Sequence, residues 1–295
     1  MKKMKLLNLK EKLDYKFKKS NFLYPASESE HLIKSALNLS LNQIITSPQQ
    51  KVGFFKILKI NYWLKQRLKG VPLAYLKKEQ TFYNLNFYVN KNVLVPRPES
   101  ELYIDLLKNR KFNNSAIIDI GTGSGCLIVS LIKNAPDYLK NNNILLASDI
   151  SIKALKIAKK NAKTFKVDKN IIFKKADLLN SLLANFPEIL KKEKILILAN
   201  LPYVEKNIWQ ESDSIKKEPK KALLASGSGL YYYKKLLQQI NTNLKNKNIE
   251  LIMEINPTQK IPLLDYIKQI LPNSQTNTIK DLNQKDRLII VKNYN

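Results

Sequence analysis

Apolar residues change their spacing along the chain, and each change marks a different kind of structure. Residues 1–75 carry apolar side chains at the spacing of amphipathic helices. Residues 81–95 instead alternate around an asparagine-rich turn, a pattern typical of a β-hairpin. From residue 116 onward, short β-branched runs alternate with segments of helical spacing. The pattern predicts a helical N-terminal part, a connecting hairpin and a C-terminal α/β part.

Two segments of the N-terminal part give specific helix signals. Ser27–Glu30 has the form of a capping box directly after Pro25 and predicts a helix start there. Residues 51–69 predict a helix whose apolar stripe is buried in a small bundle. That stripe consists of Val52, Phe55, Leu58 and Trp63. The only histidine of the chain, His31, lies in this part, and we interpret it as structural.

The C-terminal part has the periodicity of a doubly covered sheet. Strands are predicted at 116–120, 144–149, 170–174, 194–199, 249–255, 276–281 and 287–292. Helices are predicted at 124–134, 151–163, 229–245 and 258–271. Such alternation predicts a mostly parallel sheet with helices on both faces. Because no helix separates the last two strands, we expect the final strand to run antiparallel.

Composition places the chain among globular proteins of a reducing compartment. It has 295 residues, of which 44% are hydrophobic, enough for a sizeable core. No run approaches the roughly 18 apolar residues of a membrane span, and the basic N-terminus lacks the apolar region of a signal peptide. The single cysteine, Cys126, excludes an intrachain disulfide. We therefore expect a cytoplasmic protein without membrane association.

The net charge of +27 has two interpretations. A strongly basic surface is typical of proteins that bind nucleic acid or face the ribosome. Alternatively, the chain has a general bias towards lysine, asparagine and isoleucine. The lysines are scattered along the whole sequence rather than gathered in one segment. This distribution favours the compositional interpretation, although such a charge attracts polyanions at low salt.

The stretch Asn200–Tyr203 follows a strongly apolar predicted strand. Ends of strands in open α/β sheets face the ligand crevice. Asn200 offers a side-chain carbonyl, and Leu201, which precedes a proline, is held extended with its own carbonyl outward. Tyr203 adds a flat aromatic face. Together they suit an –NH₂ group with two hydrogens, although these four residues alone are equally compatible with a simple turn.

A glycine-rich loop joins the first predicted strand to its helix. Its members are Gly121, Thr122, Gly123, Ser124 and Gly125. Alternating glycines permit a tight turn and close approach of the backbone to a ligand. The third glycine comes too early for the fingerprint of pyrophosphate cofactors, which favours a smaller nucleoside carrying a carboxylate.

Acidic residues complete the cofactor pattern. Asp149 ends the second strand, where a carboxylate can bind both ribose hydroxyls, and Asp177 follows the third strand, where it can accept from an adenine amino group. With the glycine loop and Asn200, these residues come from four consecutive strand ends. The ordered set indicates S-adenosylmethionine. With one histidine and one cysteine, we expect no metal site.

A further candidate site is the segment Val95–Glu101, where prolines stand on both sides of Arg97. Pro98 and the early glutamates suit the first turn of a helix. A helix start alone would explain the glutamates. The doubled proline exceeds what a helix start requires, so we expect a functional segment here.

Several stretches together resemble the bacterial release factor glutamine methyltransferase family over essentially the whole chain. They are Gly70–Tyr75, Val95–Glu101, Asp119–Gly125, Asn200–Tyr203, Glu218–Leu223 and Gly229-Leu230. The glycine loop is common to many methyltransferases. The Arg-Pro-Glu segment combined with Glu-Pro-Lys-Lys-Ala-Leu is much more specific.

This resemblance implies the fold and its domains. It implies a Rossmann-like class I S-adenosylmethionine-dependent methyltransferase sheet, with the last strand antiparallel, after a helical bundle and a hairpin linker. Residues 1–78 would form the N-terminal substrate-recognition domain, 79–96 the linker and 97–295 the methyltransferase domain. The implied activity is methylation of the glutamine side-chain amide in the Gly-Gly-Gln motif of peptide chain release factors. We expect a monomer that needs no stable nucleic-acid binding.

The resemblance also implies roles for individual residues. Catalysis would fall to Asn200, Leu201, Pro202 and Tyr203. Cofactor binding would use Gly121, Thr122, Gly123, Ser124, Gly125, Asp149, Asp177, Leu178 and Asn200. Substrate binding would use Arg97, Glu99, Asn200, Leu201, Pro202 and Tyr203.

Two positions depart from the family pattern. Leu201 replaces the first of two prolines, but its contribution is a backbone carbonyl that leucine also has, so we expect a proline there to be tolerated. Leu178 stands where an aromatic residue often follows the aspartate, so adenine would pack on an aliphatic side chain.

Two alternative functions stay open at this stage. Ribosomal RNA adenine-N6 dimethyltransferases also carry Asn-Leu-Pro-Tyr, and the basic charge superficially favours them. A resemblance to those enzymes would imply the reverse domain order, however, with a helical domain after the methyltransferase core. A degenerate module that binds cofactor without methylating anything is the third interpretation, and the intact Asn200, Pro202 and Tyr203 argue against it.

Overall fold

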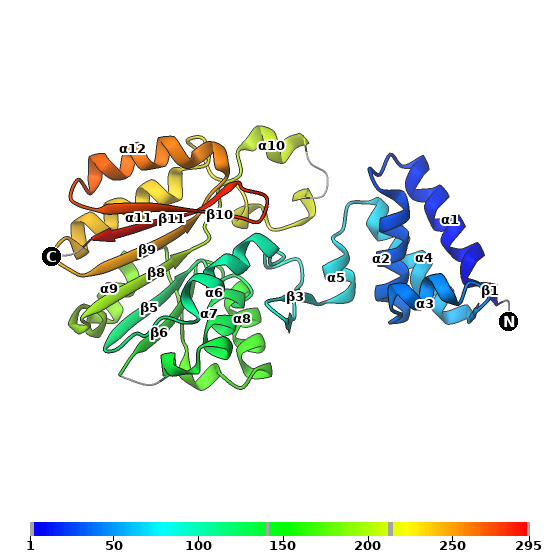
Figure 1. The fold of residues 1–295 in the computed structure, drawn as a ribbon, viewed down its shortest axis with the longest axis horizontal. Coiled ribbons are helices and arrows are strands. Elements are labelled where there is room, and N and C mark those ends of the chain that lie inside the picture. The colour runs from blue at the N-terminus through cyan, green and yellow to red at the C-terminus, as the bar shows by residue number, and fades with distance from the viewer. Residues whose placement is uncertain (1–2, 140–141, 212–214, 294–295) are drawn as a thin grey trace. The chain divides into compact units, whose positions relative to one another are not determined.

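The computed structural model describes residues 3–139, 142–211 and 215–293. The chain divides into two compact units, whose elements are labelled in Figure 1. The first unit comprises residues 1–78 with the short segment 213–217, and the second comprises residues 79–212 and 218–295. Among the described residues, no helix combines the length and the apolar character needed to cross a membrane.

The first unit is a helical bundle with a small strand pair. Its helices are α1 (Leu6–Lys19), α2 (Pro25–Leu37), α3 (Leu41–Thr46), α4 (Phe54–Leu68) and α5 (Leu73–Lys77). Strand β1 (Met4–Lys5) pairs antiparallel with β2 (Lys51–Val52). The core joins α1, α2 and α4 through buried side chains that include Leu9, Phe17, Leu32, Ile60 and Trp63. The predicted helical bundle therefore has an apolar core of its own.

The predicted helix start at Ser27 is wrong. Helix α2 begins at Pro25, and no side chain caps its N-terminus. Proline suits the first position of a helix because its missing N–H has no partner there in any case. Ser27 therefore lies inside the first turn. A complete capping box instead opens α3, where Ser40 and Gln43 exchange side-chain and backbone bonds.

Three of the four residues of the predicted stripe on α4 are also placed differently. Val52 is buried, but in strand β2 rather than in the helix. Phe55 is 74% exposed and Leu58 is 49% exposed. The helix starts only at Phe54 and turns Ile60, Trp63 and Leu64 towards the core. Phe55 and Leu58 consequently lie on the outer face of this bundle.

A short hairpin begins the second unit. Strand β3 (Gln80–Phe82) pairs antiparallel with β4 (Leu85–Phe87). The two turn residues, Tyr83 and Asn84, both have positive φ, as the tightest hairpin turns require. The predicted hairpin extended to residue 95, which is too long. Beyond Phe87, the N–H and C=O of Tyr88 are bonded to the Asn161 side chain rather than to a partner strand.

The second unit is built on one seven-stranded sheet. Its strands are β5 (Ser115–Ile120), β6 (Ile144–Asp149), β7 (Ile172–Lys175), β8 (Lys194–Ala199), β9 (Ile249–Glu254), β10 (Gln275–Lys280) and β11 (Asp286–Asn293). Their order is β10-β11-β9-β8-β5-β6-β7. The neighbouring strands β9, β8, β5, β6 and β7 are parallel to one another. Strand β11 runs antiparallel to both of its neighbours, β9 and β10. The predicted α/β class and antiparallel final strand are confirmed.

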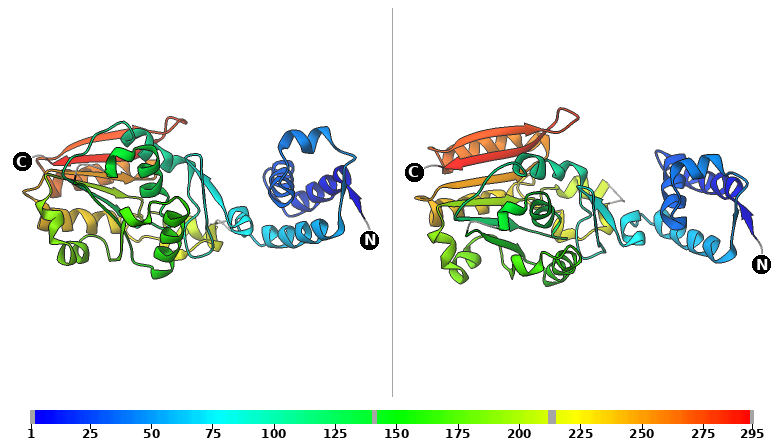
Figure 2. Two further views of the ribbon diagram at one scale, coloured as in Figure 1. Left: turned by 90° about the horizontal axis from the view of Figure 1, so that it is seen from below. Right: turned by 60° about the horizontal axis from the view of Figure 1, so that its bottom comes forward.

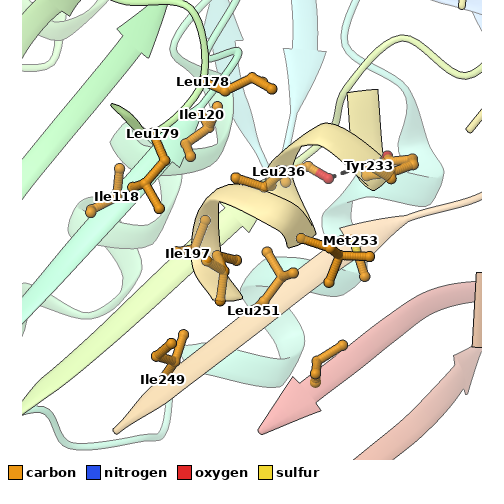
Figure 3. Close-up of a cluster of buried hydrophobic side chains, with 14 of the residues drawn as sticks. Ile118, Ile120, Leu178, Leu179, Ile197, Tyr233, Leu236, Ile249, Leu251 and Met253 are labelled. Atoms are coloured by element: carbon orange, nitrogen blue, oxygen red, sulfur yellow. Dashed lines mark hydrogen bonds between the residues drawn. The ribbon is translucent and has the colours of Figure 1, made fainter. Parts of the chain in front are cut away.

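Helices cover both faces of this sheet (Figure 2). The helices of the second unit are α6 (Leu102–Leu107), α7 (Cys126–Asn134), α8 (Ile152–Thr164), α9 (Asn180–Asn185), α10 (Lys206–Glu211), α11 (Tyr231–Leu244) and α12 (Lys260–Ile270), and all except α10 contribute to the sheet cores. One core contains side chains of α6, α7 and α8. The other contains side chains of α9, α11 and α12, and Figure 3 shows Leu236 of α11 over Ile197 and Leu251 of the sheet. Successive strand residues such as Leu196 and Ile197 therefore point into opposite cores.

The strand order contains one reversal that matters for function. From β5 the chain moves to β6 and β7, then returns to β8 on the other side of β5. Helices that leave β5 and β8 therefore diverge to opposite faces, which opens a crevice at the carboxyl ends of these two strands.

Candidate active site

The carboxyl ends of β5, β6, β8 and β9 lie in register across the sheet. The residues that end or directly follow them are Gly121, Asp149, Asn200 and Glu254. The crevice at the reversal therefore brings together residues from four separate strands. Sequence analysis assigned a role to the first three of these residues and none to Glu254.

A cavity of about 540 Å³ opens at this edge, lined entirely by the second unit. Most of the predicted site residues line it: Arg97, Gly121, Thr122, Gly123, Ser124, Asp149, Asp177, Leu178, Asn200, Leu201 and Pro202. Glu99, Gly125 and Tyr203 are not among the lining residues. One continuous space thus connects the predicted cofactor residues with the Asn200–Pro202 segment.

The glycine loop is held by contacts on both sides. Gly121 has φ +75°, and a Cβ there would lie 3.1 Å from Cδ2 of Leu201. Gly123 also has positive φ and donates its N–H to Asp149 Oδ2 at 3.0 Å. Gly125 has φ +80°, and a Cβ there would meet Cβ of Ala158 in α8 at 3.1 Å. In this structure Gly125 allows helices α7 and α8 to approach closely.

Asp149 has the geometry of an acceptor for two hydroxyl groups. Its Oδ1 accepts from the N–H of Ser151 at 2.8 Å, and its Oδ2 accepts from the N–H of Gly123. Burial raises the pKa of this carboxyl, and the two backbone bonds act in the opposite direction. Each carboxylate oxygen has a second acceptor position. Both oxygens can therefore accept one hydrogen bond more, as a ribose diol requires.

Asp177 and Leu178 also line the cavity. Asp177 Oδ2 accepts from Lys235 Nζ at 2.6 Å, and its side chain is half exposed. Leu178 has φ +57° and packs into the sheet core while also lining the cavity. An aliphatic surface beside an acceptor suits the face and the amino group of a purine, so the residues present fit the predicted cofactor.

Asp119 lies beneath the glycine loop and was not predicted as a site residue. It is buried at the end of β5, and its Oδ2 accepts from Thr122 Oγ1 at 2.7 Å. Burial raises its pKa to about 7. Its position at a strand end, directly before the glycines, is the signal that sequence analysis could have used.

Asn200 has one side of its amide bonded inward and the other free. Its Nδ2 donates to Ser100 Oγ at 2.9 Å and to Glu254 Oε2 at 3.0 Å. Within the described residues Oδ1 accepts no hydrogen bond and is not enclosed. The carbonyl of Leu201 likewise has no partner in that part of the chain, while its N–H donates to Tyr233 Oη at 3.3 Å. Two neighbouring acceptors on residues that line the cavity are therefore without a partner among the described residues.

Tyr203 is tied to the same carboxylate as Asn200. Its hydroxyl donates to Glu254 Oε1 at 3.0 Å, and burial is the largest cause that raises the pKa of this phenol. Its backbone carbonyl accepts from Gln259 Nε2 at 2.9 Å. Both ends of Tyr203 are thus fixed, one by the last residue of strand β9 and the other by Gln259, five residues further along the chain.

Arg97 is held by an acidic partner that sequence analysis did not assign. Glu218 Oε1 accepts from Arg97 Nη2 at 2.5 Å, and Glu218 Oε2 accepts from the N–H of Val95 at 2.9 Å. Glu218 is buried. The two motif segments that surround Arg97 and Glu218 are therefore joined in space. The predicted substrate-binding role of Glu99, which lies outside the cavity lining, stays a prediction.

The fold and these strand ends define a class I S-adenosylmethionine-dependent methyltransferase. Relatives align along nearly the whole chain. The release factor glutamine methyltransferase of Mycoplasma mycoides is 35% identical over 290 residues, which are 95% of this chain and 96% of the relative. The enzyme of the same name from Flavobacterium psychrophilum is 33% identical, covering 92% and 90%. The chain belongs to the release factor glutamine methyltransferase family.

Two further comparisons concern a family model and a solved structure. The family model of ribosomal protein L11 methyltransferase (PrmA) matches residues 98–251. Among solved structures, the hMettl16 catalytic domain in complex with MAT2A 3′UTR hairpin 6 has a TM-score of 0.52 at 14% identity, covering 84% of this chain and 86% of that one. This likeness concerns the fold alone.

Proposed function

We propose that this protein transfers a methyl group from S-adenosylmethionine to the side-chain amide nitrogen of the glutamine in the Gly-Gly-Gln motif of peptide chain release factors. Relatives named release factor glutamine methyltransferase, which match along both units, support this substrate. A substrate of this kind places the enzyme in the cytoplasm. We expect it to act as a monomer.

The observation that carries the proposal is the pair of free acceptors on residues that line the cavity. A primary amide has two hydrogens on its nitrogen, and Asn200 Oδ1 and the Leu201 carbonyl can accept one each. An amide nitrogen is a poor nucleophile because its lone pair is delocalised. Two fixed acceptors turn the nitrogen lone pair towards the cofactor end of the cavity, which lowers the orientational cost of the reaction.

The proposed reaction is an in-line displacement at carbon. S-adenosylmethionine supplies a methyl group bonded to a positively charged sulfur. The glutamine nitrogen forms a bond to this carbon while the sulfur–carbon bond breaks and sulfur keeps the bonding electrons. Positive charge would develop on nitrogen, which would then lose one proton to water. Asn200 Oδ1 and the Leu201 carbonyl face this charge with their negative ends and stabilise the transition state.

The remaining site residues would bind the cofactor and position the glutamine amide. Asp149 would hold the ribose hydroxyls, Asp177 and Leu178 the adenine, and residues 121–124 would approach the rest of the cofactor closely. Pro202 would keep Leu201 extended. Tyr203 would pack against the glutamine amide plane with its hydroxyl held by Glu254.

We propose that the first unit recognises the protein substrate. Its helix α4 exposes an apolar stripe, here called the α4 stripe, composed of Phe55, Leu58 and Tyr62. These positions are three and four residues apart and so lie on one face of the helix. Contiguous apolar groups on a surface are typical of protein-binding sites. Every proposed cofactor residue, by contrast, belongs to the second unit.

The alternative of ribosomal RNA adenine dimethylation is not favoured. It rests on the Asn-Leu-Pro-Tyr stretch and the basic charge. Relatives that match the helical unit as well as the methyltransferase unit are named glutamine methyltransferases. These relatives align with the helical unit before the sheet as well as with the sheet itself.

The test is a methylation assay with purified release factor, with ribosomal RNA and ribosomal proteins as competing substrates. We expect one added methyl group on the Gly-Gly-Gln peptide, located by mass spectrometry. Asn200→Ala should lower kcat by about 10²-fold, the scale of one well-placed polar group in a transition state, with little change in cofactor affinity. Methyl transfer to RNA adenine with an unmodified release factor would refute the proposed substrate.

A further inference from the structure

A buried carboxylate connects three residues at the end of the proposed active site. Glu254 ends strand β9 and is 1% exposed. Its Oε2 accepts from Ser100 Oγ at 2.5 Å and from Asn200 Nδ2 at 3.0 Å, and its Oε1 accepts from Tyr203 Oη at 3.0 Å. Two segments that are 100 positions apart in sequence thus share one acidic partner.

This arrangement determines which way the Asn200 amide faces. An asparagine amide has nearly the same shape in both orientations, so its surroundings must select one. In its ionised form Glu254 only accepts hydrogen bonds, and it therefore admits the NH₂ side. Burial raises the pKa of this carboxyl, and the hydrogen bonds from Ser100 and Tyr203 act in the opposite direction. Ser100 directs its hydroxyl hydrogen to Glu254, which leaves its lone pair for Asn200 Nδ2 at 2.9 Å. Both hydrogens of Nδ2 are then used, and the reversed amide would set Oδ1 against the carboxylate.

We propose that Glu254 is a positioning residue for methyl transfer. It turns the Asn200 amide so that Oδ1 faces the substrate nitrogen, and it holds the Tyr203 ring through the phenol hydroxyl. Glu254 acts through these two residues and touches neither substrate nor cofactor. The inference rests on the proposed function for its kinetic consequence, but the amide orientation itself is independent of any substrate.

The second buried glutamate of the same strand provides a matched control. Glu250 is also 1% exposed and, four residues earlier on β9, points to the same face of the sheet. It is paired with Lys194 at 2.8 Å and with Arg110, at the opposite end of the strand from Asn200. Glu250→Gln therefore removes a buried charge from β9 without changing the Asn200 network.

The kinetic test compares Glu254→Gln with Glu250→Gln. Glutamine keeps the shape of glutamate but presents an NH₂ group, which admits the reversed Asn200 amide. We expect Glu254→Gln to lower kcat for release factor methylation by about 10²-fold, with cofactor Kd changed less than about threefold. Glu250→Gln should lower stability while kcat stays near that of the wild type. Equal effects of the two variants on kcat would overturn the proposal.

A spectroscopic test needs no substrate and separates this inference from the proposed function. The side-chain NH₂ signals of Asn200, assigned by their loss in Asn200→Ala, should exchange slowly with water in the wild type. Their exchange should accelerate by about tenfold or more in Glu254→Gln and stay unchanged in Glu250→Gln. Unchanged exchange in Glu254→Gln would refute the positioning role even if the enzyme methylates release factor.

Ser100→Ala serves if Glu254→Gln does not fold. It removes one acceptor of Asn200 Nδ2 and leaves Glu254 in place. Faster exchange of the Asn200 NH₂ group, with a lower kcat at unchanged cofactor Kd, supports the proposal. Unchanged exchange and unchanged kcat in this variant contradict it.

Discussion

Asp119 shows how strongly one buried carboxyl group can link this fold to pH. Its pKa is raised to about 7 by burial, against roughly 3.9 in an unfolded chain. Between these values the folded state binds a proton that the unfolded state has released. The free energy of unfolding therefore decreases as pH rises through this window.

We predict that Asp119→Asn removes this pH dependence. Between pH 5 and pH 8, the wild type should lose about 2–3 kcal/mol of unfolding free energy relative to the variant. Urea unfolding of both proteins at several pH values measures it. Other titrating groups occur in both proteins and cancel, so a difference that stays constant with pH would contradict the assignment.

Leu201 corrects an expectation drawn from the family pattern. A proline here was expected to be tolerated because only the carbonyl takes part. The structure shows that the N–H of Leu201 donates to Tyr233 Oη and that the side chain lies in the sheet core. Proline would remove both contacts. Leu201 therefore contributes a hydrogen bond and core packing that a proline would not provide.

Two of the residues that sequence analysis missed, Glu218 and Glu254, have partners that are remote in sequence. Ser100 and Glu254 are 154 positions apart, and Val95 and Glu218 are 123 apart. No local spacing reveals such pairs. Asp149 and Asn200 could be predicted because each stands at the end of a recognisable apolar strand.

The loop that contains Asn200–Tyr203 depends on a glycine from the following segment. Gly229 has φ +75°, and a Cβ there would lie 2.2 Å from the Tyr203 carbonyl oxygen and from Gln259 Nε2. Gln259 Nε2 donates to the carbonyls of Tyr203 and Ser228. Gly229 therefore allows two loops and the start of α12 to meet.

We predict that Gly229→Ala displaces this loop. Overpacking and the unfavourable φ should together lower the free energy of unfolding by about 2–4 kcal/mol, and kcat should fall with it. Chemical denaturation and the methylation assay measure the two effects.

Gly227 provides the control for this substitution. It also has positive φ, but a Cβ there meets nothing within 4 Å. Gly227→Ala should cost only about 1 kcal/mol of backbone strain and leave kcat unchanged. If the two alanine variants behaved alike, close packing at Gly229 would not be the cause.

Elements were predictable where burial alone decided them. Each strand of the central sheet matches its predicted range within two residues. For the buried strands β5, β6, β8, β9 and β11, the reason is that buried apolar runs have few alternatives. Strands β7 and β10 are largely exposed, so burial does not explain their agreement. The hairpin was extended too far since one side chain, Asn161, satisfies the backbone of Tyr88. The start of α2 was predicted at Ser27 instead of Pro25 because two valid start signals overlap there.

At the scale of the whole molecule, the two units should separate recognition from chemistry. We predict that the double variant Phe55→Ser, Leu58→Ser lowers kcat/KM for intact release factor by roughly tenfold or more, the effect of losing an apolar anchor in an interface. Activity towards a short Gly-Gly-Gln peptide should not change. Steady-state kinetics with both substrates provide the comparison.

Leu23 supplies the matched control for the α4 stripe. It is exposed in the turn between α1 and α2, outside the stripe. Leu23→Ser should leave both activities unchanged. A parallel loss of peptide and protein methylation in the double variant would show that the stripe has no separate role in recognition.

The sequence predicted the sheet and its helices but not the order of the strands. Alternating strands and helices imply parallel pairing, and the missing helix before the last strand implied its reversal. Which strands become neighbours depends on how the two cores pack, and hydrophobic spacing does not contain that information. The position of β11 between β9 and β10 is the clearest example.

This position of β11 has a consequence for the biosynthesis of the protein. A chain leaves the ribosome from its N-terminus, so β5 to β9 emerge well before residues 286–293. Until those residues appear, the fully buried strand β9 has an unpaired edge, and β10 has no neighbour to join it to the sheet. Unpaired strand edges are prone to association with other chains. The methyltransferase unit is therefore expected to be most vulnerable to misassembly in the interval between the emergence of β9 and that of β11.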